Sequence, residues 1–180
     1  MRTVIASLTL LAATPASAEV VRADPHAFAV RHSVQLVVPA AEAMAAFTRI
    51  AGWWSKDHTY SGNAANLSLD ARPGGCFCER FPAKNGLGGG GIEHLRVTAI
   101  TPGEDLVLTG ALGPLLAEAV TGVMSVHVEK IAGGSRLTLD YRAAGFANGN
   151  GTKFAPMVDA MLGEQAKRFR AFAAGGGGRR

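Results

Sequence analysis

The chain has 180 residues, of which 48% are hydrophobic and 18% charged, and its formal net charge at pH 7 is +4. That length is enough for one domain with a buried core and too short for two ordinary domains. The basic residues are spread along the chain and form no stripe with interleaved aromatic residues, which argues against a nucleic-acid partner.

The N-terminus has the features of a secretory signal peptide in the right order. Arg2 supplies a positive charge, residues 4–13 form an apolar run too short to cross a bilayer, and small residues mark cleavage after Ala18. No later segment is apolar enough to span a membrane, so we expect a periplasmic or secreted protein. The predicted organisation is a signal peptide over 1–18, one domain over 19–174 and a flexible Gly/Arg tail over 175–180.

The mature chain is predicted to begin with a strand that leads into a helix. Over residues 26–39 the apolar residues and His32 alternate with a second set of residues, which is typical of a half-buried strand. Pro39 ends this strand and suits the first turn of a helix. Apolar residues at helical spacing then predict a helix that runs to the tryptophan pair and breaks near Gly52.

A series of short strands follows. Their predicted ranges are 66–70, 75–81, 92–100, 105–112, 120–131 and 135–146. A glycine-rich connection joins the second and third of them, and the tripeptide AGG joins the last two as a tight hairpin. The string GLGGGG formally contains G-x-G-x-x-G, but no helix follows that could receive a phosphate, so we predict no dinucleotide cofactor.

The last element is the longest predicted helix, over 153–174, with methionine, leucine and phenylalanine residues on one stripe. This order predicts an α+β architecture, in which a curved antiparallel sheet of about six to seven strands wraps around the long C-terminal helix. We expect such a sheet and a single helix to leave an apolar cavity between them, the usual place for a small molecule.

These elements resemble the polyketide cyclase/START-related superfamily (SRPBCC, helix-grip fold), in the branch similar to activators of the heat-shock-protein ATPase. The matching features are VVPAAEAMAAFT at the strand-to-helix entry, the WW pair, YSG-(x)3-NLSLD-(x)2-PGG-x-F-x-E over 60–79, the turn TPGEDLVLTGALGPL, the hairpin GGSRLTLDY and the closing helix. The resemblance implies the helix-grip fold over nearly the whole mature chain. Members range from ligand carriers to cyclases to co-chaperone-like proteins, so it implies no single function.

Strand alternation predicts which polar side chains face the cavity. His32, Glu79, Glu93 and Tyr141 share a face with apolar neighbours and are expected to point inward, whereas His94 is expected outside. Two carboxylates that share a desolvated site raise the pKa of at least one of them, which would suit acid–base chemistry. The alternatives are a hydrogen-bonded role in the core for His32, a contact with backbone or an arginine at the cavity mouth for Glu79, and a solvated position at the edge of the glycine-rich connection for Glu93.

Cys76 and Cys78 are the only cysteines, and both are expected on the outer face of their strand. Residues two apart on an extended strand lie about 6.5–7 Å apart between Cα atoms, at or beyond disulfide range, so a bridge would need a local kink. Together with His94 they would give three potential metal ligands, but the two cysteines lack the usual two intervening residues. We therefore predict no metal site.

We expect an exported protein that holds a small hydrophobic molecule in a central cavity, without a cofactor. The expected ligand contacts are Trp53, Trp54, Tyr60, Phe77, Glu79, His32 and Tyr141. Trp53 and Trp54 cannot face the same way on a helix, so one should pack under the terminal helix and the other should stand at the cavity mouth with Tyr60.

Two alternative functions remain open. One is an enzyme of the cyclase/dehydratase kind, with Glu79 or His32 as the general base. The other is a protein-interaction module like the chaperone activators, although an exported protein would not meet a cytosolic ATPase.

Overall fold

The computed structural model describes residues 18–84 and 88–177 of the chain. The predicted signal peptide, apart from Ala18, lies outside the described residues, and so do the tip of the glycine-rich connection and the end of the tail. Among the described residues, no helix is both long enough and apolar enough to cross a membrane.

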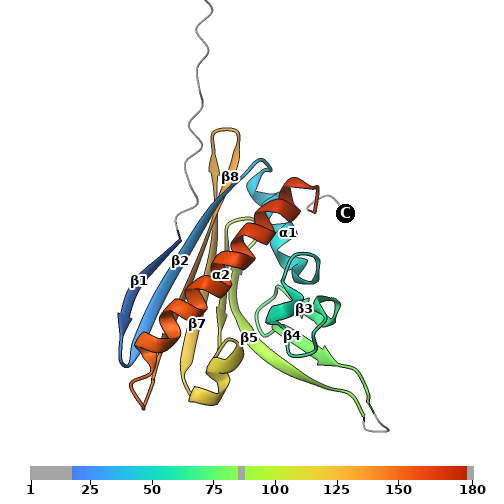
Figure 1. The fold of residues 1–180 in the computed structure, drawn as a ribbon. Coiled ribbons are helices and arrows are strands. Elements are labelled where there is room, and N and C mark those ends of the chain that lie inside the picture. Colours follow the sequence, from blue (N-terminus) through green and yellow to red (C-terminus); the bar gives the residue numbers. More distant parts are fainter. Residues whose placement is uncertain (1–17, 85–87, 178–180) are drawn as a thin grey trace, which may run out of the picture.

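The described residues form one antiparallel sheet of eight strands, in the order β1-β2-β8-β7-β6-β5-β4-β3, with helix α2 lying across it (Figure 1). The strands are β1 (Ala18–Asp24), β2 (Ala27–Leu36), β3 (Leu67–Leu69), β4 (Cys76–Phe81), β5 (Gly90–Thr101), β6 (Asp105–Thr109), β7 (Thr121–Ile131) and β8 (Gly134–Ala144). The helices are α1 (Ala40–Thr48), α2 (Gly151–Ala174) and the 3₁₀ helices η1 (Ile50–Gly52), η2 (Lys56–His58), η3 (Ala64–Asn66) and η4 (Gly113–Glu118). The predicted α+β architecture is confirmed.

Strand β1 is the one strand of the described sheet that the sequence analysis did not predict. It pairs with β2 at the edge of the sheet, and the Asp24 carboxylate accepts hydrogen bonds from the backbone N–H groups of His26 (3.0 Å) and Ala27 (2.9 Å) at the turn. Its sequence AEVVRAD has no regular alternation of apolar and polar residues, so the pattern did not reveal it. Cleavage after Ala18 would remove only the first residue of this strand.

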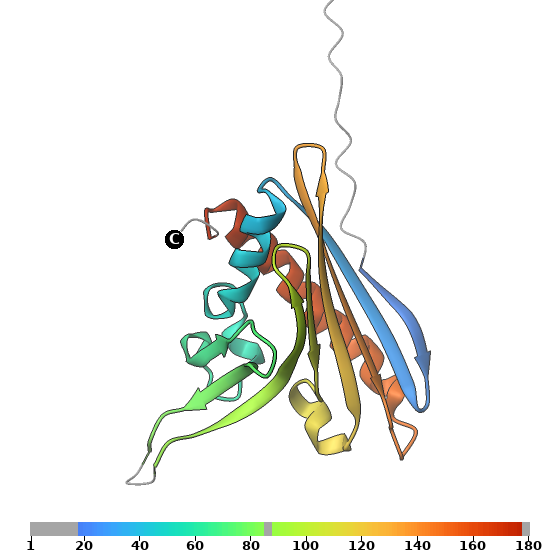
Figure 2. The same cartoon turned by 180° about the vertical axis from the view of Figure 1, so that it is seen from behind.

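Helix α2 crosses the concave face of the curved sheet. Figure 2 shows the molecule from the opposite side, with the sheet nearer to the viewer than the helix. Large apolar side chains fill much of the space between the two. They include the fully buried Phe28, Phe146, Leu162 and Phe169. Each such side chain contributes roughly 1.5–3 kcal/mol when it is buried, so this layer is the main source of the stability of the fold.

Tyr141 on β8 lies within this packed layer, and its hydroxyl forms hydrogen bonds with two backbone groups. Its hydroxyl donates to the carbonyl oxygen of Gly110 (3.0 Å) and accepts from the N–H of Leu112 (3.0 Å), so it secures the chain where β6 ends. Burial raises the pKa of Tyr141 to about 12. A Cβ atom on Gly122 would lie 2.4 Å from this hydroxyl, so the close approach requires glycine.

Replacing Tyr141 by Phe should destabilise the fold by about 1–3 kcal/mol, because the buried N–H of Leu112 and the partly buried carbonyl of Gly110 lose their partner. Urea unfolding followed by circular dichroism measures this change. Tyr60→Phe is the matched control, since that ring is half exposed and should change stability by less than about 0.5 kcal/mol. Equal effects of the two substitutions would contradict the role assigned to the buried hydroxyl.

Candidate functional site

A cleft of about 270 Å³ opens between the loop that follows Trp54, strand β5, the start of η4 and helix α2. This volume is close to the lower end of the range of about 300–1,000 Å³ that is usual for small-molecule sites. The residues that line it are Trp54, Asp57, His58, Thr59, Tyr60, His94, Leu112, Gly113, Pro114 and Met161. Aromatic and aliphatic side chains thus share its wall with two imidazole rings.

The two tryptophans face different neighbours, as expected. Trp53 donates its indole N–H to the carbonyl of Phe47 (3.1 Å) and packs against Phe169 of α2, with ring centroids 5.2 Å apart. Trp54 packs against Phe77, with centroids 5.1 Å apart, and lines the cleft together with Tyr60. Trp53 therefore belongs to the core under the terminal helix, and Trp54 belongs to the wall of the cleft.

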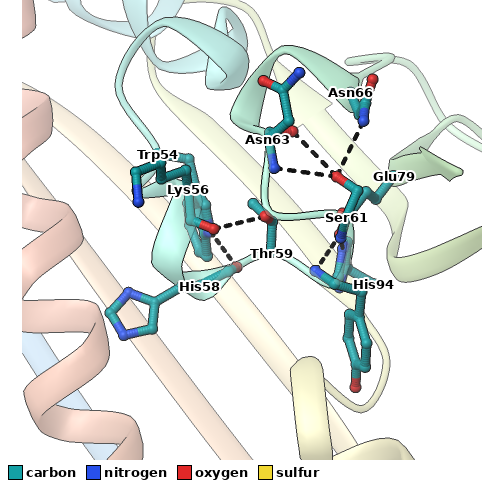
Figure 3. Close-up of polar contacts among 10 residues, drawn as sticks. Trp54, Lys56, His58, Thr59, Ser61, Asn63, Asn66, Glu79 and His94 are labelled. Atoms are coloured by element: carbon teal, nitrogen blue, oxygen red, sulfur yellow. Dashed lines mark hydrogen bonds and ion pairs between the residues drawn. The ribbon is translucent and has the colours of Figure 1, made fainter. Parts of the chain in front are cut away.

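The loop of the cleft is held by Glu79 on β4, whose side chain is 0% exposed. Its carboxylate accepts hydrogen bonds from the backbone N–H groups of Tyr60 (3.0 Å) and Ser61 (2.5 Å), and it lies 3.1 Å from Nε2 of His94. Figure 3 shows Glu79, Ser61 and His94 together on one side of this loop. Burial alone would raise the pKa of Glu79, but the hydrogen bonds from the loop and from His94 outweigh it and hold the pKa below its usual value.

The predicted orientations of Glu93 and His94 are wrong, because strand β5 carries a bulge. Cys78 pairs with Glu93 and Phe77 pairs with Leu95, which leaves His94 as the extra residue. His94 is therefore buried, at 5% exposed, while Glu93 is turned to the surface and forms an ion pair with Arg96. Simple alternation along the strand does not reveal a bulge, so the sequence analysis predicted Glu93 inside and His94 outside, the reverse of what the structure shows.

The contact with Glu79 defines the hydrogen-bonding state of His94. Because an ionised carboxylate only accepts hydrogen bonds, His94 must donate its Nε2 proton to Glu79, and the neutral ring then keeps a lone pair on Nδ1. Among the described residues, Nδ1 of His94 has no hydrogen-bond partner. Burial lowers the pKa of His94, against the opposing effect of the nearby carboxylate, so a neutral ring is favoured.

On the α2 side of the cleft, His58 contacts a buried glutamine. Gln165 accepts a hydrogen bond from the backbone N–H of Ser55 (2.9 Å), and its Nε2 lies 2.8 Å from Nδ1 of His58. The sequence analysis included neither Gln165 nor His58 in the site. The available signal was that Gln165 lies between Met161, Leu162 and Phe169 on the apolar stripe of the helix, where a polar residue needs a partner.

His32 faces inward as predicted, but it lies under α2 and is not among the residues that line the cleft. Its Nε2 is 3.0 Å from Oδ1 of Asp159, yet neither atom has a hydrogen bond of good geometry. Burial lowers the pKa of His32, and the Asp159 carboxylate opposes this. His32 is thus part of the contact between strand β2 and the helix.

Of the seven predicted ligand contacts, Trp54 and Tyr60 line the cleft. The other five lie in the core or behind the wall. These are Trp53, Phe77, Glu79, His32 and Tyr141. Of the cleft residues that the prediction omitted, Asp57, His58 and Thr59 lie between Trp54 and Tyr60 in the same loop. The others come from the start of η4, helix α2 and the bulged part of β5, which meet this loop only in the folded chain.

Cys76 and Cys78 form a disulfide across one residue of β4. Their Cα atoms lie 5.4 Å apart, closer than on a regular extended strand, so the contraction that a bridge would need is present. The disulfide faces the position in β5 where the bulge begins. His94 lies on the buried side and contacts Glu79, so the set of Cys76, Cys78 and His94 considered from the sequence does not assemble.

No family model and no curated protein matches this chain. Solved structures match it over most of its length. An uncharacterised protein from Rhizobium leguminosarum has a TM-score of 0.58 at 18% identity, over 89% of this chain and 98% of its own. A protein from Rhodobacter sphaeroides has a TM-score of 0.55 at 13% identity, over 88% and 99% of the two chains. Ara h 8.0201 has a TM-score of 0.55 at 12% identity, over 82% and 97%.

These identities are low, so the similarity concerns the fold and not the function. The fold common to them is a curved antiparallel sheet around a long C-terminal helix. The helix-grip fold predicted from the sequence is therefore confirmed.

Glu79→Gln should destabilise the fold by about 2–4 kcal/mol, because an amide cannot accept all three hydrogen bonds that the buried carboxylate receives. Glu93→Gln is the matched control, since it removes only an exposed ion pair and should cost at most about 1 kcal/mol. Urea unfolding of both variants measures the difference. If Glu93→Gln were the more harmful substitution, the assignment of the buried carboxylate would be wrong.

The free energy of unfolding should fall as the pH is lowered below 6.5, the ordinary histidine value. The folded pKa values of His32 and His94 are lowered, so below that pH the unfolded chain binds more protons than the folded chain. Glu79, whose folded pKa is also lowered, adds a further loss only below 4.5.

The midpoint of urea unfolding, measured across about pH 8 to pH 4, gives this dependence. His94→Gln should reduce the decline that begins at the histidine value. Met157→Leu, which replaces an exposed side chain that does not titrate, should leave the decline unchanged. A midpoint that stays constant from pH 6.5 to pH 5 would contradict the assignment.

Proposed function

We propose that this protein is exported and binds a small, largely apolar molecule in the cleft beside Trp54. The observation that carries the proposal is the cleft itself, which is walled by Trp54, Tyr60, Leu112, Pro114 and Met161. Aromatic and aliphatic walls supply contact area, and a few polar groups orient the ligand. The helix-grip fold and the resemblance to the polyketide cyclase/START-related superfamily support a ligand-binding role.

Two observations support export. The first is the order of charge, apolar run and cleavage signal at the N-terminus. The second is the disulfide between Cys76 and Cys78, because disulfides persist in oxidising compartments such as the periplasm. Export is at odds with a co-chaperone role, which would need an ATPase partner in the cytosol.

Proton transfer to or from the bound molecule is a second candidate function, favoured by the contact between Glu79 and His94. Neither Glu79 nor His32, the two bases considered from the sequence, lines the cleft. His94 does line it, and a buried carboxylate that orients an imidazole is an arrangement used in general base catalysis. An enzyme of the cyclase or dehydratase kind would therefore use His94 as the base and Glu79 as the positioning residue.

Native mass spectrometry of the protein purified from its own host should show a retained small molecule as added mass. Binding alone predicts that this molecule stays unchanged during incubation, whereas catalysis predicts a conversion that His94→Gln abolishes. Protein that carries no added mass, and gains none from a panel of apolar small molecules, would contradict the proposed function.

Ligand binding should also alter the fluorescence of Trp54, because its ring lines the cleft. Trp54→Phe should remove the response to added ligand. Trp53→Phe is the matched control and should retain it, since Trp53 packs against Phe47 and Phe169 in the core. A response that depends on Trp53 instead would place the ligand elsewhere.

A further inference from the structure

Gln165 is a polar side chain in the apolar layer beneath α2, and it is 1% exposed. Its Oε1 accepts a hydrogen bond from the backbone N–H of Ser55, at 2.9 Å. Because a backbone N–H can only donate, this contact assigns the oxygen and the nitrogen of the amide. The NH₂ group of Gln165 must therefore be the end that faces His58.

This orientation determines where neutral His58 carries its proton. Nε2 of Gln165 lies 2.8 Å from Nδ1 of His58 and has only protons to offer, so Nδ1 must accept with its lone pair. The proton of the neutral ring is then on Nε2. The indole N–H of Trp54, which donates to the carbonyl of His58 at 2.9 Å, holds the backbone beneath the ring.

The protonated nitrogen of His58 is available to a ligand. The side chain is 33% exposed and lines the cleft, and within the described part of the chain Nε2 has no hydrogen-bond partner. The carboxylate of Glu164 lies 3.6 Å from Nδ1, which is too far for a hydrogen bond and is at the nitrogen that Gln165 already occupies. His58 thus presents an N–H donor, held by a buried partner on another element.

We propose that His58 recognises an oxygen acceptor, such as a ketone or aldehyde carbonyl, on the apolar molecule that the cleft binds. The inference rests on the proposed function, because it names the polar group that the ligand must carry. Gln165 is the positioning residue: it does not line the cleft, and it acts by holding the neutral His58 ring in the Nε2–H form.

Two probes of matched shape test this preference. In 2-acetonaphthone a carbonyl oxygen occupies the place of the terminal CH₂ group of 2-isopropenylnaphthalene, so only the ketone can accept a hydrogen bond. Isothermal titration calorimetry of the full chain should give roughly three- to tenfold tighter binding of the ketone, which corresponds to one net hydrogen bond.

The variant His58→Asn keeps an acceptor near the position of Nδ1 for Gln165 and lacks the Nε2 donor, so the preference should fall to about onefold. His127→Asn is the matched control, because His127 is exposed, pairs with Asp105 and lies outside the cleft. It should keep the full preference for the ketone.

A second measurement needs no ligand, and its decisive result comes from the wild-type protein. Nuclear magnetic resonance of ¹⁵N-labelled histidine side chains at about pH 8, where an ordinary imidazole is neutral, should show His58 with its proton on Nε2. Gln165→Met should convert this single form into a mixture of both tautomers. A wild-type His58 with its proton on Nδ1 overturns the inference.

The failures of the two proposals can be distinguished. Equal affinity for both probes in the wild-type protein overturns the role of His58 and leaves ligand binding intact. A preference that survives in His58→Asn likewise overturns it. Binding of neither probe contradicts the proposed function for molecules of this size and polarity, and the inference fails with it.

Discussion

The cleft depends on one buried charge, the carboxylate of Glu79. A carboxylate removed from water is tolerated only when its oxygens are satisfied, and here two backbone N–H groups of the loop and the imidazole of His94 provide the partners. This requirement brings three segments together: the irregular loop after the tryptophans, strand β4 and the bulged part of β5. The shape of the cleft on this side therefore follows from the hydrogen bonds that a single buried carboxylate requires.

Helix α2 shapes the opposite side through another buried polar residue. Gln165 joins the helix to Ser55 and His58, while Trp53 and Phe169 provide the surrounding apolar contact. The two sides hold their histidines in opposite forms. Glu79 accepts a hydrogen bond from Nε2–H of His94, which leaves an acceptor on Nδ1, whereas Gln165 donates to Nδ1 of His58, which leaves a donor on Nε2. Apolar side chains form the walls of the cleft, and these two contacts determine the hydrogen-bonding states of its two imidazole rings.

The bulge at His94 shows why only part of the site was predictable. The alternation rule correctly turned Phe77 and Glu79 inward, because burial alternates from residue to residue over that part of β4. The same rule failed across the hairpin, since one extra residue in β5 exchanges the orientation of Glu93 and His94. Tyr141 was also correctly predicted to face inward, and its hydroxyl forms hydrogen bonds with backbone groups of the β6–η4 connection.

The sequence by itself determined the α+β class, most strands, the long closing helix and the separate environments of Trp53 and Trp54. These depend on the spacing of apolar residues, which is a local property of the chain. Only the tertiary structure decided which polar groups reach the cleft. The bulge in β5 turns His94 inward, and Gln165 on the last helix contacts His58 of η2. Such orientations and contacts depend on strand register and on the packing of distant segments, which local periodicity does not encode.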